Sequence, residues 1–126
     1  MIRPAAIIAA KAGQVSVLLA ALAAPAAADP MYPAAKCAAF WLGWTDAAKR
    51  LTYLDVNPAD AELAARFRQA AIDEGGDPAE IDAFIKQDRR NMSLMVRANI
   101  LGDVQSTDTQ NRLMEICDTY AREHGF

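Results

Sequence analysis

Apolar and polar residues follow a helical period along most of the chain after residue 30. Beyond Pro33 the apolar positions recur at spacings of three, four and seven residues, and they are Cys37, Phe40, Trp41, Trp44, Ala48 and Leu51. Such spacings place side chains on one face of an α-helix, whereas a strand would alternate every second residue. Proline suits the first turn of a helix, where its missing N–H is not needed. The pattern therefore predicts a first helix that begins near Pro33 and buries an aromatic face.

Capping residues and glycines mark the next two helices. Asn57-Pro58 and Asp77-Pro78 each place a side-chain acceptor before a proline, which is a strong signal for a helix start. Gly75-Gly76 separates the two helices, because glycine readily adopts the left-handed conformation that ends a helix. The buried stripe of the second helix includes Phe67. The third helix is predicted from Pro78 to about Leu101.

A fourth helix is predicted after Gly102. Thr107-Asp108-Thr109-Gln110 has the pattern of a capping box, in which the first and fourth side chains bond each other's backbone amides. Short connections between helices favour antiparallel neighbours. The predicted fold is therefore all-α, a small up-down four-helix bundle.

The two cysteines of the chain are predicted to form a structural disulfide. Cys37 lies near the start of the first helix and Cys117 lies toward the end of the fourth, and these levels coincide in an up-down bundle. Both residues also lie on apolar stripes. Two such thiols are normally joined in an oxidising compartment. The alternative is a pair of separate buried thiols that act as small hydrophobic residues.

The first 28 residues have the composition of a secretory signal peptide. Arg3 and Lys11 are the only charges before Asp29, an apolar run follows from 15 to 22, and small residues end at Ala28. This order is typical of a leader that is cleaved after an A-x-A site. The run is shorter than the roughly twenty residues of a spanning helix. We predict cleavage after Ala28, which leaves one periplasmic or secreted domain, residues 29–126; a retained membrane anchor is the alternative.

The charge of the mature chain disfavours some partners. Of 13 basic residues, Arg3 and Lys11 leave with the leader, whereas all 16 acidic residues remain, so the net charge becomes −5. An acidic chain without a clustered basic face is poorly suited to the phosphates of nucleic acid or to anionic lipid. A chain of about a hundred residues can bury a core, but at this size a cross-link helps.

Catalytic and cofactor motifs are not evident in the sequence. His124 is the single histidine, and neither a G-x-S-x-G elbow nor a C-x-x-C-H haem motif accompanies it. We therefore predict no enzymatic activity and no cofactor. The alternative is a haem or copper carrier, because Met31 with His124 could hold haem. For copper, the candidate ligands are the thioether sulfurs of Met92, Met95 and Met114, because thioethers suit Cu(I).

Six consecutive polar residues, KQDRRN at 86–91, interrupt the third helix. They cover more than one helical turn, so one polar side chain must face the core. Asp88 is the best placed, because it lies four residues after Phe84 and four before Met92. The helix is either exposed or bent there, or Asp88 is a partly buried carboxylate that pairs with an arginine and organises a partner surface.

The function that these features favour is binding without catalysis. We expect an exported helical protein that binds another protein or an apolar ligand. The candidate binding residues are Phe40, Trp41, Trp44, Phe67, Asp88, Met92 and Met95. The general description also fits acid-stress chaperones of the bacterial periplasm. Cys37-x-x-Phe40 is the one motif in common, which assigns no family.

Export predicts a specific mature terminus. Mass spectrometry of the protein from its native host should show Asp29 as the first residue, because the A-x-A site ends at Ala28. A chain that keeps Met1 would contradict cleavage and favour the membrane anchor.

Overall fold

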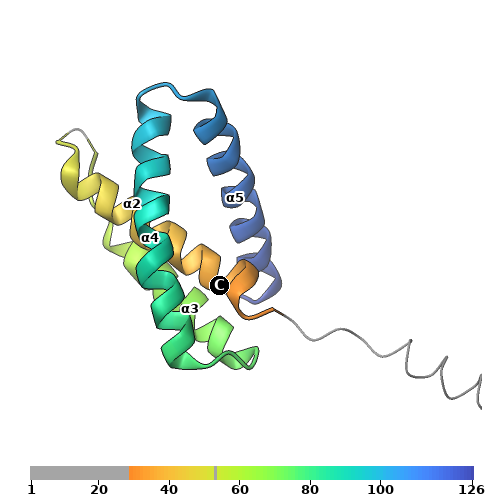
Figure 1. The fold of residues 1–126 in the computed structure, drawn as a ribbon. Coiled ribbons are helices and arrows are strands. Elements are labelled where there is room, and N and C mark those ends of the chain that lie inside the picture. The colour runs from red at the N-terminus through yellow and green to blue at the C-terminus, as the bar shows by residue number, and fades with distance from the viewer. Residues whose placement is uncertain (1–28, 53) are drawn as a thin grey trace, which may run out of the picture.

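The computed structural model describes residues 29–52 and 54–126, and all of its regular elements in these ranges are helices (Figure 1). A short helical turn, η1 (Met31–Ala35), leads into four α-helices. They are α2 (Lys36–Arg50), α3 (Pro58–Asp73), α4 (Pro78–Ile100) and α5 (Val104–Glu123). The predicted all-α class is confirmed. The predicted leader, residues 1–28, lies outside the described residues.

The ends of α3 and α4 follow the predicted capping residues. Asn57 accepts a hydrogen bond from the second amide of α3, and Asp77 accepts one from the third amide of α4, each at 3.0 Å. Gly75 follows α3 and Gly102 follows α4, with φ angles of 101° and 93°. A residue with a Cβ rarely adopts these angles, so the two glycines fix where the chain turns.

The last helix begins earlier than the sequence pattern predicts. Asp103 is its N-cap and accepts a hydrogen bond from the amide of Ser106 at 2.8 Å. Thr107 already lies inside the first turn of α5, where its hydroxyl donates to the carbonyl oxygen of Asp103. The prediction failed because the glycine that ends α4 is followed at once by a capping aspartate, which leaves no loop for the later capping box to close.

Helix α2 occupies the centre of the structure. It packs most extensively against α4 and next against α3, while α5 returns along the C-terminal half of α4 (Figure 1). Although α3 and α4 are consecutive, they contact each other little. An ideal up-down bundle would pack each helix beside its chain neighbour. Here α2 instead crosses α4 obliquely, so the helical bundle is present with a different packing order.

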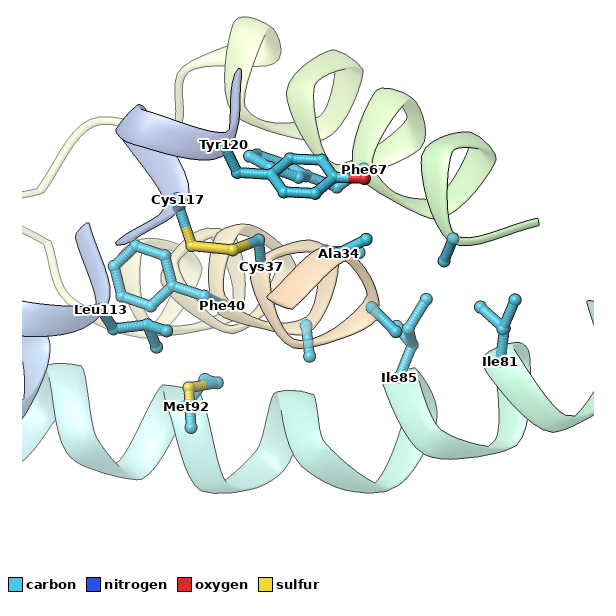
Figure 2. Packing of buried hydrophobic residues seen from close by; sticks show 14 residues of the cluster. Ala34, Cys37, Phe40, Phe67, Ile81, Ile85, Met92, Leu113, Cys117 and Tyr120 are labelled. Atoms are coloured by element: carbon cyan, nitrogen blue, oxygen red, sulfur yellow. A yellow bond between two sulfur atoms is a disulfide. The ribbon is translucent and has the colours of Figure 1, made fainter. Parts of the chain in front are cut away.

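The core surrounds the disulfide between Cys37 and Cys117 (Figure 2). The two Cα atoms are 5.7 Å apart, within the range that a disulfide requires, so the predicted bond is confirmed. Phe40 and Leu113 lie on one side of the sulfur atoms, and the ring of Tyr120 lies on the other. Because α2 and α5 make few other close backbone contacts, this bond is their main connection.

The crossing of α2 over α4 depends on Gly43. A Cβ atom at this position would lie 2.5 Å from Cβ of Met92, 2.7 Å from the carbonyl oxygen of Arg89 and 2.8 Å from the amide nitrogen of Ser93. Two of these are backbone atoms of α4, which no side-chain rotation can remove. Glycine in a helix interior costs about 1 kcal/mol relative to alanine. The close approach of the helices offsets that cost.

We expect Gly43→Ala to destabilise the protein by about 1–3 kcal/mol, because the clash with α4 exceeds the gain in helix propensity. Urea denaturation followed by circular dichroism measures the change in the free energy of unfolding. Ala83→Gly, at an exposed position of α4, is the control and should cost about 1 kcal/mol through propensity alone. A Gly43→Ala variant more stable than the wild type would contradict the close crossing.

Candidate binding surface

The apolar residues predicted to bind a partner belong to the core. Three are buried: Phe40, Phe67 and Met92. Three are partly buried and pack against the same cluster: Trp41, Trp44 and Met95. Met114, the third methionine of the copper hypothesis, packs there as well. Phe40, Phe67 and Met92 are therefore inaccessible to a partner in this conformation, whereas Trp41, Trp44 and Met95 keep part of their surface exposed.

The predicted burial of Asp88 is confirmed, and its partner is a lysine. Asp88 is 8% exposed, whereas Lys86 is exposed and Arg89 is intermediate. Lys36, from the start of α2, donates a hydrogen bond to Oδ1 of Asp88 at 3.3 Å. Its Nζ also lies 3.1 Å from Oδ2, without hydrogen-bonding geometry. The expected arginine partner was wrong because the neighbouring Arg89 leaves the helix in another direction.

Arg89 forms a second ion pair between α4 and α2. Its guanidinium donates two hydrogen bonds to the carboxylate of Asp46, both at 2.8 Å. Lys36–Asp88 therefore joins α4 to the first turn of α2, and Arg89–Asp46 joins it near the last turn. Asp88 and Arg89 both belong to the polar interruption of α4, so this segment binds α2 on both sides of Gly43.

His124 lies in a polar cluster at the end of α5. Its ring stacks on Tyr120 with the centroids 3.7 Å apart, its Nδ1 is 2.8 Å from the carbonyl oxygen of Tyr120, and its Nε2 is 3.7 Å from Oε1 of Glu74. The hydroxyl of Tyr120 donates to the same carboxylate. Burial and this hydrogen bond raise the pKa of Tyr120 far above its usual value. Both ring nitrogens of His124 face protein oxygens, an arrangement that holds the helix end.

Large aliphatic side chains are exposed in the second half of α4 and at its C-cap. Leu94, inside the helix, is 60% exposed, and Leu101, the C-cap residue, is 85% exposed. Arg90 and Arg97 alternate with them at spacings of four, three and four residues, so all four side chains lie on one stripe of the helix. We call these residues, Arg90, Leu94, Arg97 and Leu101, the Arg–Leu stripe.

A cavity of about 380 Å³ adjoins this stripe where the end of α2 lies against α4. Its lining consists of Asp46, Lys49, Arg50, Arg90, Ser93, Leu94 and Arg97, and we call it the basic cleft. The one acidic residue, Asp46, already accepts both hydrogen bonds of Arg89. Within residues 29–52 and 54–126, the four cationic side chains that line the cleft form no ion pair with a carboxylate.

The basic cleft corrects the expectation that the chain has no clustered basic face. It gathers four of the eleven basic residues that follow the predicted leader. Lys49 and Arg50 also suit the last turn of α2, where cations interact favourably with the helix dipole. Arg97 likewise lies in the last turn of α4, whereas Arg90 lies inside that helix, where the dipole gives no such explanation. The cluster could not be predicted from the sequence, because Lys49 and Arg50 precede Arg90 and Arg97 by at least forty positions and only the packing of α2 on α4 brings them together. The alternation of arginine and leucine within α4 is visible in the sequence.

We expect Asp88→Ala to destabilise the protein by about 1–3 kcal/mol, because Lys36 loses its partner near the core. Asp82→Ala is the matched control: Asp82 pairs with Arg68 through two hydrogen bonds, but its side chain is 55% exposed, against 11% for Asp88. Its loss of stability in urea denaturation should be distinctly smaller. Equal losses for the two variants would show that the Lys36–Asp88 pair is no more important than a surface pair.

Three further observations do not point to a particular function. No helix in the part of the chain that the structure describes has the length and apolar character needed to cross a membrane. In the same residues, no group of three or more histidine, cysteine or carboxylate side chains is arranged to hold a metal ion. Comparison with protein-family models, with curated proteins and with solved structures finds no match to this chain.

Proposed function

We propose that the protein is an exported, non-enzymatic binding module that binds another protein on the Arg–Leu stripe and the basic cleft. The observation that carries this proposal is the exposure of Leu94 and Leu101 beside Arg90 and Arg97, which have no carboxylate partner in the described residues. Leucine side chains that form a row on the surface, next to uncompensated cations, are typical of an interaction site. Binding through such a face needs no catalytic group and also suits a chaperone-like role.

Export is the second part of the proposal. The disulfide between Cys37 and Cys117 is compatible with an oxidising compartment, and such bonds are rare in the cytosol. The leader-like composition of residues 1–28 supports the same location. In a periplasmic or secreted protein, the covalent link also fixes the α4–α5 hairpin relative to α2. A fixed surface loses little entropy on binding, which favours affinity.

Site-specific photo-crosslinking in the native host tests the proposed binding face. A photoreactive amino acid at position 94 of the full chain should yield a discrete adduct with a second protein, because Leu94 lies at the centre of the stripe. The control places the same group at position 118, where Asp118 is exposed on α5 outside the cleft. The proposal fails if both positions give the same adducts or if position 94 gives none.

A further inference from the structure

We propose that the partner of the Arg–Leu stripe is an acidic amphipathic helix, whose carboxylates enter the basic cleft and whose aliphatic side chains cover Leu94 and Leu101. This inference rests on the proposed function, because it names the chemistry of the partner for the same face. Spacing, charge and exposure each support it independently.

The spacing of the stripe is that of a helix–helix seam. Positions 90, 94, 97 and 101 follow the alternating steps of four and three residues by which one helix packs along another. Leucine and arginine alternate in this seam, so a complementary helix presents apolar side chains at one set of positions and acidic side chains at the other. The stripe extends over about 16 Å, or roughly three turns, at 1.5 Å per residue. A partner segment of similar length would cover it.

The charge of the cleft selects carboxylates. Lys49 and Arg50 from α2 face the same cavity as Arg90 and Arg97 from α4. Asp46 pairs with Arg89, which balances its negative charge, so the four cations that line the cleft keep a net positive charge. Carboxylates of a partner would balance this charge, and arginine binds a carboxylate through two parallel hydrogen bonds. The cleft therefore favours an acidic partner.

Two other anionic ligands match the surface less well. A free phosphate or other small anion would satisfy the cleft but leave Leu94 and Leu101 exposed to water. An anionic membrane could accommodate both the leucines and the arginines. However, the net charge of −5 after the predicted leader would oppose its approach. An acidic polypeptide uses both features of the surface, and it can be small enough to avoid repulsion from the acidic remainder.

Fluorescence anisotropy with a labelled synthetic peptide tests the inference. The probe is a helical peptide about three turns long, with leucine and glutamate alternating at seam positions. It should bind the full mature chain, and its affinity should fall by roughly tenfold or more in the double variant Arg90→Gln, Arg97→Gln. Leu94→Ala should also weaken binding. Raising the salt from about 50 to about 300 mM should weaken it further, because the contacts are charged.

Three controls separate this pattern from general electrostatic attraction. A peptide with glutamine in place of glutamate should not bind. Arg112→Gln should leave the affinity unchanged, because Arg112 is exposed on α5 outside the basic cleft and donates a hydrogen bond to the carbonyl oxygen of Asp108 in its own helix. Circular dichroism should show that the variants keep the wild-type helix content, since the altered side chains lie outside the core.

The acidic-helix assignment is wrong if the glutamate peptide does not bind, or if the glutamine peptide binds with the same affinity. It is also wrong if Arg112→Gln lowers the affinity as much as the double variant does. Finally, it is wrong if the protein binds phosphatidylglycerol vesicles but not the peptide, and the double variant weakens that vesicle binding. Crosslinking at position 94 distinguishes this failure from that of the proposed function. If the adduct persists in the Arg90→Gln, Arg97→Gln double variant, the face binds a protein by other chemistry. If no adduct forms even in the wild-type background, the binding face itself is wrong.

Discussion

The contact between Gly43 and the backbone of α4 positions the other elements of this protein. Without a side chain at Gly43, α2 and α4 approach until backbone atoms meet. The Lys36–Asp88 and Arg89–Asp46 ion pairs then join α4 to the two ends of α2. This geometry also carries the end of α2 over the middle of α4, where the basic cleft forms. The cleft is thus a consequence of packing, and a change in the crossing angle would separate its two pairs of cations.

The disulfide compensates for limited packing between α2 and α5. Cys37 and Cys117 are buried with Phe40 and Leu113, yet the two helices share few other close backbone contacts. A bond that closes a loop of this length stabilises a protein by about 4–5 kcal/mol in the chain-entropy model. That amount is comparable to the whole stability of many small domains. The covalent bond therefore supplies much of the stabilisation that packing between α2 and α5 does not provide.

Local signals in the sequence were sufficient for the helices, the disulfide and the burial of Asp88. Asn57 and Asp77 cap their helices through neighbouring amides, and the helical period alone directs Asp88 inward. Local patterns could not predict the features that depend on how α2 crosses α4. Lys36 meets Asp88 only because α2 lies across α4, and the same holds for the basic cleft. The true start of α5 was missed because two capping patterns follow each other and the later one is more complete.

The connection between Cys37 and Cys117 also makes most of the domain a closed covalent ring. The bond joins residues 80 positions apart, and every connection between α2, α3, α4 and α5 lies inside that interval. A protease that cuts one of these connections opens the ring but does not divide the molecule. The two fragments stay tethered at a high effective concentration, so their helices can reassociate instead of diffusing apart. A single nick therefore alters the chain's topology while leaving it one molecule.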